Sequence, residues 1–533
     1  MADKELMIYD TTLRDGAQGE GISFSVADKV KLIRVLDDLG VAYIEAGNPA
    51  SNPKDAALFE RLHELHLRHA KIAAFGSTVR PKTEPENDSG LAALLAADTP
   101  VVTIFGKAWD LHVTQVLRTT QKENLRMIDA SIRYLKAAGR EVIFDAEHFF
   151  DGYKQNPAYA LRTVCTARDA GADTIVLCDT NGAAFPDEIT AAVRAAAQAA
   201  QGARLGIHCH NDMDLATANT IAAVLAGAVQ VQGTLNGFGE RCGNANLCVL
   251  LPNLQLKRGY RCIAPEKLCS LRDTARFVFE LANLSPDEKM PYIGSNAFAH
   301  KGGMHIDAVQ KNPATFEHID PAAVGNRRRL LLSEMSGRST VIGAIRKIDD
   351  SIVRDSKETG EILNEVKDLE LAGYQFEDAE GSFALLVRKK LGKYKPFFTL
   401  DQFQVITHAP KDAPCVSTAL IKITSGGVSE ITAAEGEGPV NALDKALRKA
   451  LGRFYPSLSK MRLVDFKVRI IDGNDATASL TRVLIESSDG TETWTTIGVS
   501  RDIVEASWKA LVDSVEYMLE KEEGTGKIEQ EKA

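Results

Sequence analysis

The sequence has little of several features that mark particular classes of protein. Its 533 residues include only eight cysteines and no C-x-x-C pair, which argues against a zinc ribbon, a thioredoxin-type site or a disulfide framework. No apolar run approaches the roughly 20 residues that cross a bilayer. Glycine and proline are near average, which excludes collagen-like and wholly disordered chains. The sparse cysteines and the charged N-terminus, which lacks a secretory signal, predict a cytoplasmic protein.

The excess of one sign of charge over the other is also small. The 63 Lys and Arg residues stand against 72 Asp and Glu residues, a net charge of −9, and no long basic run occurs. We therefore expect neither a nucleic-acid partner nor a membrane partner. The 44% hydrophobic and 25% charged residues are typical of a globular protein, and the length predicts two to four folding units.

The first half of the chain repeats one pattern: a short apolar run, a polar cluster, and an Ala- and Leu-rich stretch with helical spacing. The eight apolar runs are Leu6–Tyr9, Ala42–Glu45, Lys71–Phe75, Val101–Phe105, Glu141–Phe144, Thr174–Cys178, Leu205–Cys209 and Val229–Leu235. Such runs indicate parallel strands buried on both faces. Eight of these units in about 250 residues predict an α/β fold, a (β/α)8 TIM barrel over residues 1–280. A doubly wound open sheet usually carries G-x-G-x-x-G after its first strand, and this sequence does not.

The pattern changes after the predicted barrel. Residues 281–396 predict a helical linker region. Residues 397–520 alternate β-rich runs with two helical stretches and predict an α+β regulatory domain. The expected strands are Phe403–Thr407, Ser417–Thr424, Phe466–Ile471 and Ser479–Glu486, the helices are Asn441–Leu451 and Ile503–Leu519, and the turns are Gly436–Pro439 and Gly498–Ser500. The charged, glycine-broken residues 521–533 predict a disordered tail.

Polar residues follow the ends of the predicted barrel strands, where the loops of such a barrel converge at one mouth. His208 and His210 lie two residues apart on the seventh strand, so both rings point to the same face. With Asp15 they form a two-histidine, one-carboxylate set, which binds a divalent cation and leaves positions open for substrate. Asn244 or a water would complete the shell. We expect Mn²⁺ or Mg²⁺, with Zn²⁺ or Co²⁺ as alternatives; taken alone, the H-x-H pair is also compatible with simple barrel packing.

Three further residues stand at predicted strand ends. Arg14, next to Asp15, is a fixed cation that would stabilise an enolate or alkoxide during the reaction. The alternative is that Arg14 forms a structural ion pair at the rim of the barrel. Thr180 would donate a hydrogen bond to a substrate carboxylate, or cap the next helix. Glu147 would contact substrate or shift the pKa of a neighbour, or form a salt bridge at the rim.

Six strings of the sequence resemble the family of 2-isopropylmalate, homocitrate and citramalate synthases. Three carry the general resemblance: D-T-T-L-R-D-G from Asp10, H-C-H-N-D from His208 and G-E-R-C-G-N from Gly239. Three more are most similar to the citramalate synthase branch: S-N-P-K-D from Ser51, F-D-A-E-H-F-F-D-G-Y from Phe144 and A-H-K-G-G-M-H from Ala299. The resemblance extends from residue 6 to about residue 520.

This resemblance implies a metal-dependent condensation of acetyl-CoA with pyruvate, giving (R)-citramalate and CoA at the start of a threonine-independent route to isoleucine. The implied metal ligands are Asp15, His208, His210 and Asn244. The implied roles are stabilisation of the developing oxyanion by Arg14 and binding of the substrate carboxylate by Thr180. His305 matches the family's catalytic histidine, which a partner subunit often delivers, and Asn312 falls in a substrate-binding motif near it.

The family pattern also implies a homodimer and a C-terminal domain that senses isoleucine. Two positions depart from it: residue 316 is Phe where relatives usually have a Tyr that assists catalysis, and Asn48 replaces a bulky aromatic residue. A pocket lined by Asn48 would change the preference among 2-oxo acids. The alternatives are a sister synthase acting on another 2-oxo acid, a lyase with the same barrel, and an inactive effector-binding protein.

Overall fold

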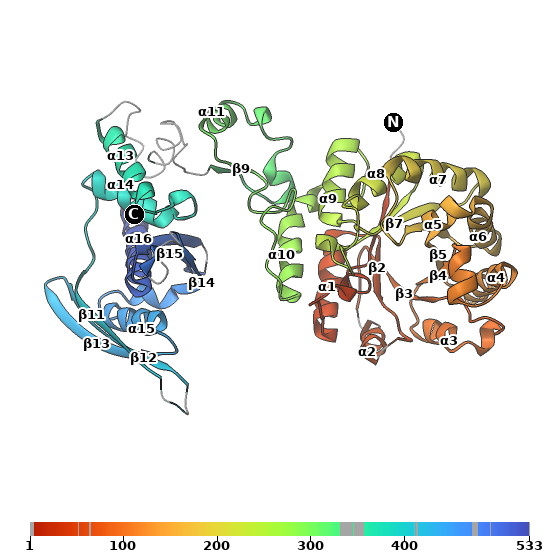
Figure 1. Ribbon diagram of the computed structural model, residues 1–533, viewed down its shortest axis with the longest axis horizontal. Coiled ribbons are helices and arrows are strands. Elements are labelled where there is room, and N and C mark those ends of the chain that lie inside the picture. Colours follow the sequence, from red (N-terminus) through yellow and green to blue (C-terminus); the bar gives the residue numbers. More distant parts are fainter. Residues whose placement is uncertain are drawn as a thin grey trace. The chain divides into compact units, whose positions relative to one another are not determined.

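The computed structural model describes residues 5–51, 53–62, 65–330, 345, 357–409, 411, 414–471, 478–490 and 492–531, with side chains described as far as residue 523. The chain forms two compact units (Figure 1). The first unit runs to Phe298 and includes His318–Arg328. The second consists of Ala299–Glu317 and the residues from Arg329 onward. Each unit has a hydrophobic core of its own.

The first unit is a closed barrel of eight parallel strands in sequence order, so the TIM-barrel prediction is confirmed. The strands are β1 (Met7–Asp10), β2 (Tyr43–Gly47), β3 (Lys71–Ser77), β4 (Val101–Lys107), β5 (Glu141–Glu147), β6 (Thr174–Asp179), β7 (Leu205–Cys209) and β8 (Gln230–Gly233). Each begins within one residue of its predicted apolar run. The barrel closes where Met7 of β1 pairs with Gln230 of β8.

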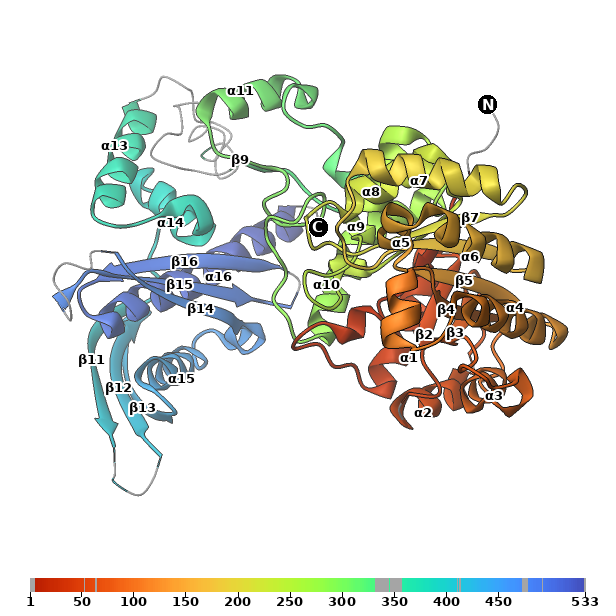
Figure 2. The same ribbon diagram turned by 45° about the vertical axis from the view of Figure 1, so that its right-hand side comes forward.

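Helices cover the outside of the barrel (Figure 2). They are α1 (Val26–Leu39), α2 (Pro53–Leu62), α3 (Ser89–Ala96), α4 (Gln121–Ala137), α5 (Phe149–Gln155), α6 (Pro157–Ala170), α7 (Pro186–Ala199), α8 (Ala216–Ala226), α9 (Leu247–Pro252) and α10 (Leu271–Leu281). Local sequence sets several of their ends. A capping box between Ser25 and Asp28 starts α1, and Gly40, in the left-handed conformation at φ 93°, ends it.

Alternate residues of the strands pack on opposite sides of the barrel wall. Ile8 belongs to the large core between strands and helices, whereas its neighbour Tyr9 packs with Ile143 and Val176 in a separate buried cluster. Because side chains alternate along a strand, this second cluster fills the inside of the barrel. The barrel is therefore closed by side chains below its mouth.

The second unit is an α+β structure, as predicted. Two short strands, β9 (Ala299–His300) and β10 (Arg329–Leu330), pair in parallel. Its helices are α11 (Gly303–Lys311), α13 (Lys357–Leu371), α14 (Glu380–Lys390), α15 (Pro439–Leu451) and α16 (Ile503–Glu531). Two antiparallel sheets consist of β11 (Thr399–His408), β12 (Val416–Ser425) and β13 (Val428–Gly436), and of β14 (Arg462–Ile470), β15 (Thr481–Ser488) and β16 (Thr493–Ser500). Helix α15 packs on the first sheet and α16 on the second.

Short helices of other types connect these elements. They are η1 (Gly16–Gln18), η2 (Pro85–Asn87), η3 (His112–Val116), η4 (Leu235–Gly237), η5 (Asn253–Lys257), η6 (Pro265–Ser270), η7 (Pro313–Thr315), η8 (Pro321–Val324), η9 (Phe376–Asp378) and η10 (Pro456–Lys460). Within the described residues, no helix is both long enough and apolar enough to cross a membrane. All eight cysteines are free thiols.

Three expectations for the C-terminal half were wrong. Strands β13 and β16 were not predicted, and Gly498, expected in a turn, lies inside β16. A Cβ atom at Gly498 would lie 1.9 Å from the carbonyl oxygen of Ala506, so this glycine permits the close approach of α16. The predicted disordered tail is helical as far as Glu531, in agreement with the helix propensity of its Lys and Glu residues. In the predicted helical linker region, α13 begins at Lys357, and residues 346–356 lie outside the described residues.

Candidate active site

The loop after β1 has a shape that its own sequence fixes. The buried carboxylate of Asp10 accepts hydrogen bonds from the backbone N–H and the hydroxyl of Thr12, both at 2.9 Å. The Thr12 hydroxyl in turn accepts from the backbone N–H of Leu235, also at 2.9 Å. Burial raises the pKa of Asp10 to about 7 against these hydrogen bonds. The result is a turn, tied to the strand-eight loop, that holds Arg14 and Asp15 at the mouth of the barrel.

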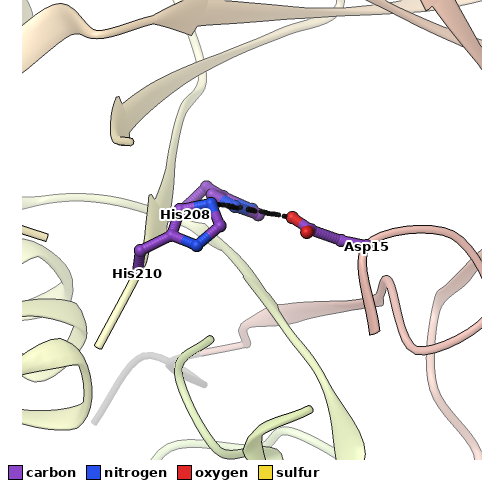
Figure 3. A group of neighbouring side chains, drawn as sticks. All are labelled: Asp15, His208 and His210. Atoms are coloured by element: carbon purple, nitrogen blue, oxygen red, sulfur yellow. Dashed lines mark hydrogen bonds and ion pairs between the residues drawn. The ribbon is translucent and has the colours of Figure 1, made fainter. Parts of the chain in front are cut away.

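Asp15, His208 and His210 meet in one buried cluster at this mouth (Figure 3). The Oδ2 atom of Asp15 lies 3.2 Å from Nε2 of His208 and 3.8 Å from Nε2 of His210. The two Nε2 atoms are 3.3 Å apart. Ligand atoms about 2.1 Å from a metal and roughly 90–110° apart are separated by about 3.0–3.4 Å. The spacings of 3.2 and 3.3 Å agree with ligands of one cation, and the 3.8 Å between Asp15 and His210 is wider than this range.

The electrostatics of the cluster favour a positive charge between its members. The pKa of Asp15 lies well below its usual range, since Arg14, His208 and His210 together outweigh the effect of its burial. Burial alone would lower the pKa of His208, but the hydrogen bond and the charge of Asp15 raise it. Burial and the charge of His208 lower the pKa of His210 to about 4. A divalent cation fits this donor set of one carboxylate and two imidazoles.

Asn244, the fourth predicted ligand, lies beside His210, with which it forms an isolated antiparallel bridge. Its side-chain nitrogen donates to the carbonyl oxygen of Phe238 at 3.0 Å. Its Oδ1 atom is buried and has no hydrogen-bond partner among the described residues. An unpaired buried carbonyl oxygen costs free energy, which coordination of a cation would recover.

Arg14 is held on two sides. Its Nε donates to the fully buried carboxylate of Glu45, and its guanidinium carbon lies 3.8 Å from the centre of the Phe75 ring. One terminal nitrogen lies 3.6 Å from Oδ2 of Asp15. Ion pair, stacking and burial thus fix a permanent positive charge next to the donor cluster.

A pocket of about 280 Å³ opens over the cluster. Its lining includes the predicted site residues Arg14, Asp15, Glu147, Thr180, His208 and His210. The Thr180 hydroxyl accepts the backbone N–H of His148 at 2.9 Å, which leaves its own proton free to donate. Glu147 forms an ion pair with Lys107 at the pocket edge.

Asn48 lines a neighbouring cavity of about 260 Å³, which shares Arg14, Gln18 and Phe75 with the pocket over the cluster. Its side-chain oxygen accepts the backbone N–H of Ala50 at 3.0 Å.

Two predicted residues belong to the second unit and not to the barrel cluster. His305 lies exposed on α11, where its ring stacks on that of Phe316 with the centroids 4.1 Å apart. Asn312 follows α11 and caps η7 by accepting the backbone N–H of Ala314. Phe316 is thus the direct ring neighbour of His305.

Sequence reasoning assigned no role to several residues that build the site. They are Glu45, Phe75, Phe105, Asp145, Cys178 and Gln232. Polar residues inside otherwise apolar strands were the available signal for Glu45 and Gln232. The two phenylalanines gave no signal, because an aromatic residue in a buried strand is ordinary.

A closed barrel with two histidines and a carboxylate at its mouth defines a class of protein, the (β/α)8 enzymes with a candidate site for a divalent metal. The HMGL-like family matches residues 5–278. The homocitrate synthase post-HMGL domain-like family matches residues 292–373, and the LeuA allosteric (dimerisation) domain matches residues 377–519.

Relatives narrow the class. A protein of Geobacter sulfurreducens named (R)-citramalate synthase is 53% identical over 519 residues, 97% of this chain and 98% of that one. Another of this name, from Synechocystis, is 52% identical over 97% of both chains. A 2-isopropylmalate synthase of Sulfurisphaera tokodaii is 35% identical over 69% of this chain and 91% of its own. The chain therefore belongs to the (R)-citramalate synthase family of enzymes.

Proposed function

We propose that this enzyme condenses acetyl-CoA with pyruvate to give (R)-citramalate and CoA. Near-full-length similarity to (R)-citramalate synthases supports this reaction. The observation that carries it is one pocket in which Asp15, His208 and His210 lie beside Arg14 and Thr180. Such a pocket offers a cation site, a fixed positive charge and a hydroxyl donor, which are the groups that a 2-oxo acid needs.

The metal ligands in this proposal are Asp15, His208 and His210, with Oδ1 of Asn244 as a further donor. A divalent cation bound there polarises the keto carbonyl of the 2-oxo acid as a Lewis acid. Mn²⁺ or Mg²⁺ is the proposed ion, and Zn²⁺ or Co²⁺ also fits two imidazoles and a carboxylate.

Arg14 and Thr180 bind the two polar ends of the 2-oxo acid. The guanidinium of Arg14, held by Glu45 and Phe75, hydrogen-bonds the oxygen that becomes an alkoxide when the new carbon–carbon bond forms. The Thr180 hydroxyl donates to the substrate carboxylate, because its acceptor role is already used by His148. Asn312 is proposed to contact substrate.

Proton transfer requires a base for the acetyl methyl group. His305 is the proposed base: its ring is exposed on α11 and stacks on Phe316. The resulting carbanion attacks the keto carbon, the alkoxide takes up a proton, and water then cleaves the thioester to release CoA and the second carboxylate. Glu147, at the pocket edge beside Lys107, is a second residue proposed to take part in proton transfer.

The walls of the pocket favour a small 2-oxo acid. Phe75 and Phe105 stack with their centroids 5.4 Å apart, and both line the pocket together with Cys178. A methyl group fits beside two rings more easily than a branched chain, which favours pyruvate over 2-oxoisovalerate.

A panel of 2-oxo acids tests the proposal. Purified protein is incubated with Mn²⁺ or Mg²⁺, acetyl-CoA and pyruvate, 2-oxobutyrate, 2-oxoisovalerate or 2-oxoglutarate, and free thiol is followed. The expected result is the highest kcat/KM with pyruvate and a product that co-elutes with (R)-citramalate. Faster turnover of another oxo acid would indicate a sister synthase, and absence of CoA release with every oxo acid would favour a lyase.

The second unit has a proposed regulatory and assembly role. The LeuA allosteric (dimerisation) match over residues 377–519 supports a homodimer and an amino-acid effector, for which isoleucine is the proposed ligand. Exposed apolar side chains on the second sheet, Val464, Val468 and Ile470 of β14, support an interface there. We place the enzyme in the cytoplasm, at the first step of a threonine-independent route to isoleucine; its eight free thiols agree with a reducing compartment.

A further inference from the structure

A chain of hydrogen bonds lies behind one histidine of the donor cluster. The Nδ1 atom of His208 is 3.0 Å from Oε1 of Gln232, its register neighbour on β8. The side-chain nitrogen of Gln232 donates to Oδ1 of Asp145 at 3.2 Å. All three side chains are buried. Three strands, β5, β7 and β8, thus contribute to one continuous polar connection beneath the mouth of the barrel.

The connection has a direction. The amide nitrogen of Gln232 donates to Oδ1 of Asp145, so its amide oxygen faces Nδ1 of His208. An amide oxygen only accepts hydrogen bonds, so Nδ1 of His208 must carry the proton. In a neutral imidazole the other nitrogen, Nε2, then has its lone pair exposed. Nε2 is the atom that faces Asp15 and His210.

The other histidine lacks such a partner. The Nδ1 atom of His210 is buried and has no hydrogen bond within the described residues. Of the two histidines, His208 alone has, within the described residues, a side chain hydrogen-bonded to its Nδ1 atom. This partner selects the tautomer of His208 and holds its ring. Partners of this kind orient metal-binding histidines, and their loss typically weakens metal affinity about 10- to 100-fold.

We propose that Gln232 and Asp145 are positioning residues that fix His208 in the tautomer with Nε2 available as a metal ligand. Asp145 acts through Gln232 by setting the direction in which the amide points. This inference rests on the proposed metal-dependent function, since it concerns one ligand of that metal. It adds two residues that touch His208 directly or through one side chain.

The first experiment compares wild type with Gln232→Leu. Affinity for Mn²⁺ is measured by competition with a chelator, and the visible absorption of bound Co²⁺ reports the ligand geometry. The expected result is a 10- to 100-fold weaker affinity and an altered Co²⁺ spectrum in Gln232→Leu. The matched control is Gln230→Leu, because Gln230 is also buried on β8 and neither of its amide atoms has a hydrogen bond within the described residues. We expect Gln230→Leu to keep the wild-type affinity for Mn²⁺ and the wild-type Co²⁺ spectrum.

The second experiment tests the direction of the chain. In Asp145→Asn, the new amide can donate as well as accept, so Gln232 is no longer held in one orientation and affinity falls. In the double variant Asp145→Asn/Gln232→Glu, the carboxylate at position 232 accepts from the amide introduced at position 145 and from Nδ1 of His208. The hydrogen bond between positions 145 and 232 is reversed, but Nδ1 of His208 again donates to a fixed acceptor, and the total charge is that of the wild type. Metal affinity therefore recovers to the wild-type value or above it, which a role in packing alone does not predict.

The outcomes separate this inference from the proposed function. If the wild type binds neither Mn²⁺ nor Co²⁺, the proposed metal-dependent function fails. If the wild type binds both and Gln232→Leu binds them equally well, the positioning role is wrong. The unfolding midpoint of each metal-free variant is measured as well. If Gln232→Leu does not fold, Asp145→Asn and the double variant decide, and equal affinities for these two overturn the inference.

Discussion

The carboxylate of Asp15 lies 3.2 Å from Nε2 of His208, although Asp15 follows the first strand of the barrel and His208 stands on the seventh. The barrel closes by pairing of β8 with β1, and β8 also pairs with β7, so the loop after β1 lies close to the end of β7 at the mouth. A pair of side chains from such distant positions depends on the whole barrel, so the candidate metal site exists only in the folded barrel.

Replacement of Asp15 by Asn tests the donor cluster itself. The amide keeps the shape of the side chain but removes the negative charge that raises the pKa of His208. We expect Mn²⁺ affinity to fall more than about 100-fold, beyond the loss typical of residues outside the ligand set. Metal content after dialysis and a chelator titration measure it. Asp129→Asn, which breaks an exposed ion pair with Arg133, is the control and retains its metal.

Arg14→Lys separates metal binding from stabilisation of the oxyanion. Lysine keeps the positive charge beside Asp15 but loses the fork that pairs with Glu45 and the planar face that stacks on Phe75. We expect kcat/KM for pyruvate to fall about 100- to 1,000-fold, as for loss of an oxyanion donor, with metal affinity within a few-fold of wild type. Steady-state kinetics at saturating metal measure this. An equal loss in both quantities would show that Arg14 mainly maintains the metal site.

Thr180→Val removes the hydroxyl proposed to bind the substrate carboxylate and keeps the side-chain volume. A hydrogen bond to a charged group contributes about 1.5–3 kcal/mol, so KM for pyruvate should rise about 10- to 100-fold. Thr180→Ser retains both the hydroxyl and its hydrogen bond from His148, and its KM should stay near the wild-type value. Equal KM values for the two variants would show that the hydroxyl does not bind substrate. Its role would then be to accept the hydrogen bond from the backbone N–H of His148.

Phe105→Val tests the wall of the pocket. Phe105 stacks on Phe75 at 5.4 Å, and shortening it opens space beside the position of the substrate methyl group. One methylene in an apolar pocket is worth about 1–3 kcal/mol. The ratio of kcat/KM for 2-oxobutyrate to that for pyruvate should therefore rise by about a factor of ten or more. An unchanged ratio in the panel assay would place the selectivity elsewhere, for example at Asn48 in the adjoining cavity.

The barrel and the Asp15–His208–His210 cluster followed from the sequence because both depend on period and position. Apolar runs predict strands, strand order predicts the barrel, and the rule that active sites lie at the C-terminal ends of strands brings the three candidate ligands together. Residues that act through other side chains could not be found in this way. Gln232 differs from Gln230 only in having partners, and those partners are visible only in three dimensions.

The second unit was harder to predict because its glycines have two different uses. Gly436 and Gly498 suggested turns. A bend does follow Gly436, the last residue of β13, whereas Gly498 lies inside β16. Helix backbone comes close at both, and a Cβ atom at Gly436 would lie 2.4 Å from the backbone nitrogen of Ala442. The sequence shows that a glycine is needed but not whether a turn or a close approach requires it.

Stability of the second unit should depend on pH through Glu516 of α16. Burial raises the pKa of this carboxyl to about 7, against hydrogen bonds that include one from the backbone N–H of Phe397 at 3.3 Å. Because the folded state binds the proton more tightly than the unfolded state, the contribution of this group is fully present below the unfolded pKa of about 4.5 and is lost as pH rises through 7. Glu516→Gln should therefore gain stability relative to wild type on going from pH 5 to pH 8.

Urea unfolding followed by tryptophan fluorescence, to which Trp494 and Trp508 of this unit contribute, measures that difference. Glu505→Gln is the control on the same helix, because Glu505 is exposed to solvent and its hydrogen bond from Ser500 lowers its pKa. The control should gain no stability between pH 5 and pH 8. If Glu516→Gln differs from wild type by the same free energy at both pH values, the carboxyl is ionised throughout this range and its burial does not hold the proton.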